Sequence, residues 1–327
     1  MSSTAHPAPS RAAGDLPPDP SAHPTASWSE AEIEKMSAAG DRRRIDPAHL
    51  WMIIPAVVLF TGLLIVPLLQ GIFYTFTNYQ GYGDWRFVGL SNYANLFKDN
   101  VIWQSYGFTF LYAITATVLT NVIALFLANL LNSRIAGRSG WRGLYFLPNI
   151  LPVLIVSYIF SYLFTNNLPE IGQRLGWEWL STSLLANENL AWLAIVFVGV
   201  WQGVAFTTII YLAGLQTIPE EVYEAASLDG AGVWRRFTSI TFPLIMGFFT
   251  INVVLSFKNS LGVFDQVVAM TNGGPGTSTQ SISFLIFKNG FQGGEYAYQT
   301  ANGVVYFIIL IVLSFAQLKF LQSREQL

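Results

Sequence analysis

The sequence predicts an all-α polytopic membrane protein with six transmembrane helices. Of its 327 residues, 52% are hydrophobic, 15% are aromatic and only 11% are charged, which is too apolar for a soluble domain of this size. The apolar residues gather in segments long enough to cross a bilayer, and the arginines gather in alternate loops between those segments. The net charge of −2 says little, because in a membrane protein the distribution of Lys and Arg carries the information.

The six spans follow from the length of the apolar segments. A hydrocarbon core of about 30 Å needs about 20 helical residues. The segments that satisfy this lie at residues 51 to 74, 107 to 131, 143 to 165, 190 to 214, 239 to 263 and 299 to 320. We therefore expect residues 46–327 to form a six-helix transmembrane domain.

The loops predict the orientation of the spans. Arginines mark the segment before the first span and the second and fourth loops: Arg42, Arg43, Arg44, Arg134, Arg138, Arg142, Arg235 and Arg236. The other loops hold only four basic residues, diluted by acidic ones: Arg86, Lys98, Arg174 and Lys288. Since positively charged loops stay on the inner side, both termini are expected in the cytoplasm of a multi-pass protein of the plasma, or inner, membrane.

Residues 1–45 differ from the rest of the chain. They are rich in Pro, Ser and Ala and lack the apolar core of a signal peptide. This composition predicts a disordered cytoplasmic tail.

Several function classes lack the residues that they need. The chain has no G-x-x-x-x-G-K-[ST] phosphate loop, and none of its five lysines follows a glycine, so ATP is not expected to bind here. There is no cysteine, and His6, His23 and His49 all precede the first span, so metal sites and nucleophile-base pairs at bilayer depth are not expected. No Asp or Glu falls clearly within a span, which argues against a proton relay. The chain is therefore not expected to be an enzyme, to hold a metal or cofactor, or to bind nucleic acid.

A polar island at residues 219–236 separates the fourth and fifth predicted spans. Pro219 suits the first turn of a helix, and its early turns carry carboxylates that complement the helix dipole: Glu220, Glu221 and Glu224. The small side chains of Ala225 and Ala226 leave a helix face with little relief, and Gly230 can supply the positive φ that ends a helix. The island therefore predicts a short helix and turn at the membrane surface.

This island resembles the loop by which the membrane subunits of ATP-binding-cassette (ABC) importers meet their ATPase. That loop reads E-A-A, three residues, G, nine residues, I-x-L-P, and residues 224–243 match it with Phe242 in place of leucine. The segment F-V-G-L-S-N-Y at 87–93 resembles the F-V-G-L-x-N-Y of carbohydrate-importer permeases, and T-N-G-G-P at 271–275 matches their T-x-G-G-P. The chain is thus similar to the maltose and glycerol-phosphate permease family over most of its membrane region.

The resemblance implies a type I ABC importer permease with residues 219–236 as its coupling loop. Its implied partners are a second homologous permease, an ATPase dimer that binds the ATP, an external sugar-binding protein and membrane lipid. The implied ATPase contacts are Glu224 as a polar anchor, Ala225, Ala226 and Gly230 as a close surface, and Asp229 as a helix-end cap or ion-pair partner. The implied outer turn at 271–275 lies near the docked binding protein.

The same resemblance implies a sugar site on the fourth and fifth spans. In the fourth span, Gly203 would let a sugar approach the backbone, Phe206 would stack on it, and Trp201 and Gln202 would flank it. In the fifth span the family's polar positions fall on Ser256, Ser260 and Val263, of which Val263 has no hydrogen-bonding side chain. Ordinary helix packing explains the same residues equally well.

Lys258 is the one charge well inside a predicted span, and intramembrane charge commonly marks function. It could contact the substrate or a substrate phosphate, extend outward along the helix, or pair with a carboxylate such as Asp265.

The function expected is uptake of a di- or oligosaccharide, with a phosphorylated polyol as another candidate substrate. One alternative is an ATP-independent carrier or channel for a small polar solute, which leaves the coupling loop without a purpose. The other is a non-transporting membrane scaffold or sensor, in which the loop docks a signalling protein.

Overall fold

The computed structural model describes residues 47–132, 143 and 147–325. The chain divides into two units at Leu64 and Ile65. The described part of the first unit is helix α2 (Pro47–Phe60), which continues into the π-helical turn η1 (Thr61–Ile65). The predicted disordered tail lies outside the described residues, and so do the arginines before the first span and in the second loop: Arg42 to Arg44, Arg134, Arg138 and Arg142.

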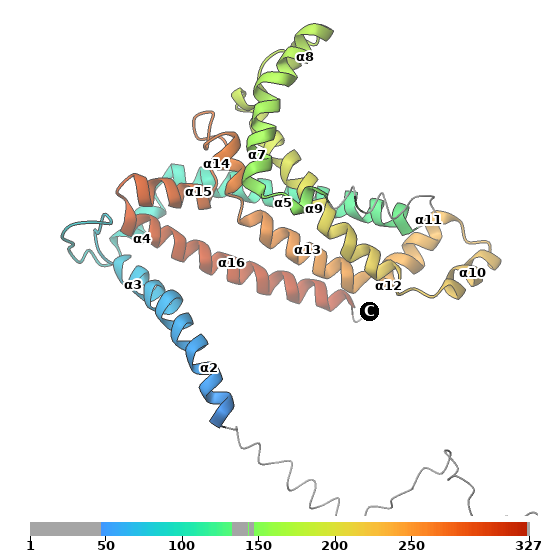
Figure 1. The fold of residues 1–327 in the computed structure, drawn as a ribbon, viewed down its shortest axis with the longest axis horizontal. Helices are drawn as coiled ribbons and strands as arrows, with labels where there is room; N and C mark the ends of the chain where they lie inside the picture. Colours follow the sequence, from blue (N-terminus) through green and yellow to red (C-terminus); the bar gives the residue numbers. More distant parts are fainter. Residues whose placement is uncertain (1–46, 133–142, 144–146, 326–327) are drawn as a thin grey trace, which may run out of the picture. The chain divides into compact units, whose positions relative to one another are not determined.

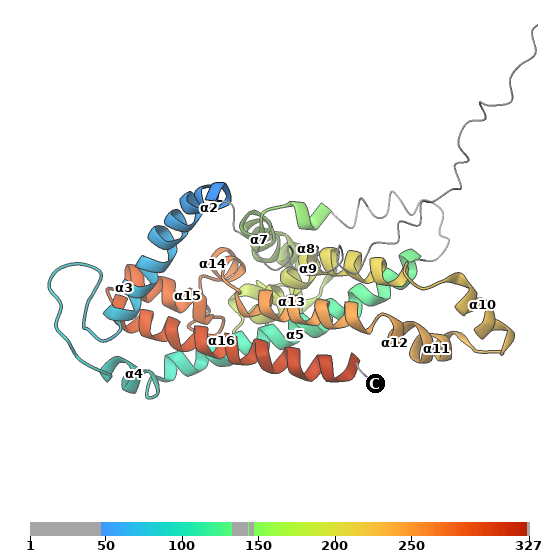
Figure 2. The same cartoon turned by 90° about the horizontal axis from the view of Figure 1, so that it is seen from below.

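Four helices in the described residues are long and apolar enough to cross a membrane, and they confirm four of the predicted spans. They are Trp51–Tyr74, which includes α3 (Val66–Tyr74), α5 (Asn100–Asn132), α9 (Ala191–Leu215), and Tyr296–Lys319 within α16 (Tyr296–Glu325). The last three are seen in Figures 1 and 2 as the longest helices of the second unit.

The fifth predicted span is bent. It runs through α11 (Val233–Arg236), the π-helical turn η5 (Phe237–Thr241), α12 (Phe242–Leu244) and α13 (Met246–Leu261), with a bend of 73° at Ile245. Pro243 lies two residues before the bend, and a proline inside a helix removes a backbone donor and crowds the preceding turn. Counted as one span, this pair raises the number among the described residues to five.

The third predicted span, residues 143 to 165, is not one continuous helix in its described part. Residues 147–150 are helical, the chain is extended at Pro152, and α7 (Val153–Tyr162) then begins. The π-helical turn η2 (Leu163–Asn167) and α8 (Leu168–Leu175) follow α7. Because a proline restricts the residue before it to extended backbone, Pro152 accounts for the break after residue 150.

Small residues bring α5 against α9 and α13. Ala116, Ala124 and Ala128 of α5 are buried, and the buried Thr120 lies between them on the same face. On α9, the pocket left by Gly214 is filled by Phe248 of α13, whose ring would lie 2.6 Å from a methyl group at that position. Close backbone approach of this kind is the usual basis of helix association in membranes.

The F-V-G-L-S-N-Y segment fixes the C-terminal end of α3. The side-chain nitrogen Nδ2 of Asn92, in α4 (Ser91–Leu96), donates to the carbonyl oxygens of Thr75 and Thr77, both at 2.8 Å. The hydroxyl of Tyr93 donates to Oγ1 of Thr75 at 2.8 Å, and Phe87 forms an isolated antiparallel bridge with Thr77. The motif therefore ties the chain after α3 to the helix that leads into α5.

The T-N-G-G-P segment is held by internal packing. It follows α14 (Asp265–Met270), and Gly273 has a φ of 86°. Gly273 is buried, and a methyl group there would lie 2.6 Å from the ring of Phe284, in α15 (Ile282–Phe287). Thr279 closes the turn by bonding the hydroxyl of Thr271 at 2.7 Å and the carbonyl of Gly274 at 2.6 Å. Gly273 is thus required by the packing of the chain itself.

Short helices complete the connections between the long ones. They are η3 (Glu178–Leu180), η4 (Leu184–Ala186), α10 (Glu220–Leu228) and the π-helical turn η6 (Lys288–Gln292).

Candidate functional site

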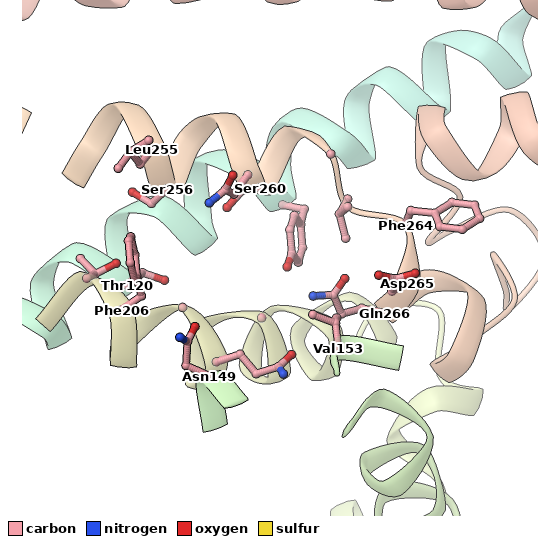
Figure 3. Close-up of a pocket in the computed structure, with 18 of the residues that line it drawn as sticks. Thr120, Asn149, Val153, Phe206, Leu255, Ser256, Ser260, Phe264, Asp265 and Gln266 are labelled. Atoms are coloured by element: carbon pink, nitrogen blue, oxygen red, sulfur yellow. The ribbon is translucent and has the colours of Figure 1, made fainter. Parts of the chain in front are cut away.

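A cavity of ≈ 420 Å³ lies between α5, α9, α13 and α14 (Figure 3). Its wall combines amide and hydroxyl side chains with aromatic rings. The lining residues are Tyr112, Thr120, Asn149, Leu151, Val153, Gly199, Gln202, Gly203, Phe206, Thr207, Asn252, Leu255, Ser256, Asn259, Ser260, Gly262, Val263, Phe264, Asp265 and Gln266. Donors and acceptors beside apolar ring faces are what a polyhydroxylated solute needs in an otherwise apolar site.

Five of the seven residues predicted to contact substrate line this cavity. They are Gln202, Gly203, Phe206, Ser256 and Ser260. Their spacing explains why they meet, because positions three or four apart share one helix face. Gln202, Gly203 and Phe206 lie on one face of α9, and Ser256 and Ser260 lie one turn apart on α13.

The structure places Trp201 and Lys258 away from the cavity. Trp201 lines an apolar hollow with Phe197 and Val204, and its ring lies 5.3 Å from that of Phe160. Lys258 lies beside α16, next to residues such as Leu310 and Ser314, and forms no ion pair within the described part of the chain. Each lies one or two positions along its helix from a cavity-lining residue, and side chains at that spacing point to a different face of the helix.

The buried side chain of Gln202 has an unused acceptor. Gln202 is 8% exposed, and its nitrogen donates in long bonds to the carbonyls of Pro148 and Leu151, at 3.5 and 3.4 Å. Its oxygen Oε1 is buried without a hydrogen-bond partner in the described residues. Since buried polar atoms are nearly always paired, Oε1 is positioned to accept a bond from a solute or water in the cavity.

Gly203 and Phe206 shape the same wall. A methyl group at Gly203 would lie 3.3 Å from Cγ2 of Thr120, so this glycine permits close packing of α9 on α5 and leaves little spare room. Phe206 is 46% exposed and, as Figure 3 shows, belongs to the group of side chains around the cavity. An aromatic face at this place can pack against the apolar face of a ring-shaped solute.

The two serines differ in how much bonding capacity remains. The Ser256 hydroxyl accepts from Nδ2 of Asn121 at 2.7 Å and donates to the carbonyl of Asn252, so only one of its lone pairs is left for a solute. Oδ1 of Asn121 in turn accepts from the Tyr211 hydroxyl at 2.7 Å. The hydroxyl of Ser260 makes no hydrogen bond to any described residue and remains available to the cavity.

Sequence reasoning missed several cavity residues. Tyr112, Thr120, Asn149, Thr207 and Gln266 line the cavity and were not predicted. The signal that could have found them is a polar side chain three or four positions from a predicted contact: Thr207 lies four from Gly203, and Asn252 and Ser256 form a similar pair. Tyr112 and Thr120 could be placed only once α5 was known to pack on α9.

The cavity wall carries few charged side chains. Among its described lining residues, Asp265 is the single acidic or basic one, and no Lys or Arg contributes. A phosphate or carboxylate solute would therefore find no cationic side chain in this wall. The arrangement suits uncharged hydroxyl groups.

A second candidate site is the exposed helix α10 and the turn after it. Pro219 precedes α10 with extended backbone, and Glu220 and Glu221 occupy its first turn. At its other end the amide of Gly230 bonds the carbonyl of Ser227 at 3.1 Å, and the amide of Ala231 bonds that of Ala226 at 2.9 Å. With a φ of 71° at Gly230, this is the Schellman pattern that ends a helix.

The predicted coupling residues differ in exposure. Glu224, Ala225, Asp229 and Gly230 are exposed, whereas Ala226 is 6% exposed and packs inside the chain. The loop is attached to η5 by a 3.1 Å bond between the hydroxyls of Tyr223 and Thr241. In the same loop, three large apolar side chains are more than three-quarters exposed: Leu228, Val233 and Trp234. This end of the second unit therefore presents apolar side chains next to acidic ones, and Figures 1 and 2 both place α10 beyond the ends of the long helices.

Comparison with known proteins gives the family of the chain. Residues 120–325 match the family described as binding-protein-dependent transport system inner membrane component. The chain is 36% identical to a multiple sugar-binding transport system permease protein of Streptococcus mutans, over 84% of this chain and 95% of the relative. It is 34% identical to a probable starch degradation products transport system permease protein of Thermoanaerobacterium thermosulfurigenes, over 84% and 94%.

A solved structure shares the fold. It is a chain of a bacterial ABC transporter involved in the import of the acidic polysaccharide alginate, with a TM-score of 0.73 and 19% identity, over 90% of this chain and 99% of that one. Together with the family match, this gives a multi-pass inner membrane protein that acts as a transport component and not as an enzyme. The chain belongs to the binding-protein-dependent transport system inner membrane component family, the permease subunits of ABC importers.

Proposed function

We propose that this chain is one of two homologous permease subunits of an ATP-driven importer for a neutral di- or oligosaccharide. The other partners are a dimer of ATPase subunits, which bind the ATP, and an external sugar-binding protein. Its 34% and 36% identical relatives are named for sugars and starch degradation products, which supports a carbohydrate substrate. No cofactor is assigned to this chain.

The observation that carries the proposal is the cavity between α5, α9, α13 and α14. A pyranose has hydroxyl groups around its edge and an apolar face, and this wall offers amides and hydroxyls beside the ring of Phe206. Gln202, Gly203, Phe206, Ser256 and Ser260 are the substrate contacts that we assign. The lack of a lysine or arginine in the described lining favours an uncharged saccharide over a phosphorylated polyol.

We assign residues 219–236 to ATPase coupling. The exposed residues Glu224, Ala225, Asp229 and Gly230 would contact a cleft of the ATPase, while Ala226 and the Tyr223–Thr241 bond would hold the helix in its orientation. Closure of the ATPase dimer on ATP would then move α10 and, through η5 and α12, the cavity wall on α13. Such a movement would expose the cavity alternately to the two sides of the membrane.

The orientation follows from the same assignment. The ATPase is cytoplasmic, so residues 219–236 and the adjoining Arg235 and Arg236 belong on the cytoplasmic face, in line with the positive-inside rule. Six spans in residues 46–327 would place both termini inside, and residues 1–45 would form a cytoplasmic tail.

The test is uptake of radiolabelled saccharide into liposomes that contain the complete complex, with loaded binding protein outside and either ATP or a non-hydrolysable analogue inside. Uptake with ATP and none with the analogue is expected. Uptake of equal rate in both preparations would replace the proposal with an ATP-independent carrier or channel.

A further inference from the structure

Tyr112 and Gly199 form a close pair between α5 and α9. The side chain of Tyr112 is 3% exposed, and its hydroxyl occupies the space where a side chain at Gly199 would begin. A methyl group at Gly199 would lie 2.1 Å from that hydroxyl oxygen and 3.2 Å from the ring carbon Cζ. The missing side chain at residue 199 is therefore what allows the phenol to reach across from α5.

The hydroxyl of Tyr112 makes no hydrogen bond to any residue that the structure describes, and the residue lines the cavity. Buried tyrosine hydroxyls normally find a partner, because leaving the group unpaired in an apolar interior costs free energy. Other buried tyrosines here obey this rule: Tyr211 donates to Asn121 and Tyr306 donates to the carbonyl of Leu261 at 2.6 Å. Tyr112 instead lines the cavity.

A second unpaired group lies in the same wall. Gln202 is three residues after Gly199 and on the same face of α9, and its buried oxygen Oε1 also lacks a partner within the described ranges. The Tyr112 hydroxyl and Gln202 Oε1 thus add a donor and an acceptor to the cavity wall, beside the free hydroxyl of Ser260. A saccharide hydroxyl can accept from the first and donate to the second.

We infer that Tyr112 is a substrate-contacting residue, which donates a hydrogen bond to a saccharide hydroxyl, and that Gly199 is the positioning residue that makes room for it. The inference rests on the proposed function, since it names a further contact for the same solute. This hydrogen bond would favour saccharides that carry a hydroxyl group at one particular position, so Tyr112 would contribute to substrate specificity.

The first test compares wild type with Tyr112→Phe in the full reconstituted complex. Maltotriose, trehalose and raffinose are offered on saturated binding protein, and the transported sugar is then replaced by each of its monodeoxy analogues. Each analogue's uptake rate is divided by that of its parent, and comparison of this ratio between the wild type and the variant cancels the preference of the shared binding protein. The wild-type ratio should fall about two- to tenfold for one analogue, which is the range for a lost neutral hydrogen bond.

In Tyr112→Phe, that analogue and its parent should be transported equally well, because the contact is already absent. A structural role would lower all rates by a common factor. If the variant keeps the wild-type pattern across the analogues, whatever its overall rate, Tyr112 does not contact the solute. If no sugar is transported by wild type in the presence of ATP, it is the proposed function that fails.

A second test addresses Gly199. Gly199→Ala should impair uptake in wild type, since the new methyl group displaces the Tyr112 hydroxyl, but should add little in the Tyr112→Phe background, where the nearest atom is Cζ at 3.2 Å. Gly107→Ala on α5 is the matched control, because a methyl group there meets no described atom within 4 Å. An equal loss from Gly199→Ala in both backgrounds would overturn the pairing.

Discussion

The side-chain amide of Asn121 donates to the hydroxyl of Ser256 at 2.7 Å, which joins α5 to α13 at the edge of the cavity. Because the Tyr211 hydroxyl also donates to Asn121, at 2.7 Å, three helices meet at this one side chain. Ser256 is thus both a predicted substrate contact and a structural residue. Substitutions at the cavity must be interpreted with this in mind.

Asn121→Ala should destabilise the permease by about 1 to 2 kcal/mol, because it removes two bonds between helices that are worth about 0.6 kcal/mol each on average and leaves Tyr211 without an acceptor. Thermal unfolding in detergent measures the effect. Asn129→Ala is the control, since within the described part of the chain the Asn129 side chain bonds only the carbonyl of Leu125, in its own helix. Equal stability losses in the two variants would show that the bonds between helices add nothing.

Gln202→Ala should lower saccharide uptake about tenfold or more, because it removes the unpaired acceptor Oε1 from the cavity. The ATPase rate without sugar should be unchanged, since no part of α10 is altered. Gln216→Ala, in an exposed glutamine at the end of α9, provides the matched control. Normal uptake by Gln202→Ala would remove this residue from the substrate site.

Gly230→Arg should abolish uptake and the recovery of ATPase with the purified permease, while the protein still reaches the membrane. Positive φ costs a residue with a side chain about 1 to 2 kcal/mol, and the added side chain would also intrude on the docked ATPase.

Gly176→Arg separates these two effects. Gly176 ends α8 with nearly the same φ, 70°, and like Gly230 it has open space around it in the described structure. The control variant should therefore carry the backbone cost alone and keep its uptake. Loss of uptake in both variants would mean that strain, and not docking, explains the Gly230 result.

Asn92→Asp should destabilise the C-terminal end of α3 by about 2 kcal/mol. The change replaces two donated bonds, to Thr75 and Thr77, with a carboxylate that faces two carbonyl oxygens. Asn95→Asp introduces the same charge at an exposed position one turn away. Hydrogen exchange of residues 75–77 would report the loss, and similar protection in the two variants would contradict the assigned role of Asn92.

The sequence predicted the long helices well because their signal is local: a run of apolar residues of sufficient length. It did not predict the bend at Ile245 or the break at Pro152, although Pro243 and Pro152 were visible, because a proline in a membrane helix can be accommodated without either. Helix periodicity would have excluded Trp201 and Lys258 from the cavity wall. Each lies one or two positions from a cavity-lining residue, Gln202 or Ser256, and such positions face different directions on a helix.

The remaining site residues depend on packing that one sequence does not encode locally. Tyr112 joins the cavity only because Gly199, 87 positions later, lies opposite it on α9. Similarly, Ala226 belongs to the predicted ATPase surface and Gly273 to the turn predicted near the binding protein, and both are buried within the chain. A small residue in a motif can serve either an external contact or an internal one, and the identity of its neighbours decides which.

The most direct test of saccharide import is the ATPase rate of the purified complex, reconstituted with its binding protein, across di- and oligosaccharides and glycerol phosphates. Stimulation by a neutral di- or oligosaccharide, with none by glycerol phosphate, is the expected result. Stimulation by glycerol phosphate alone would contradict the assignment of the cavity to an uncharged sugar, and an ATPase rate that no solute changes would contradict its role in import.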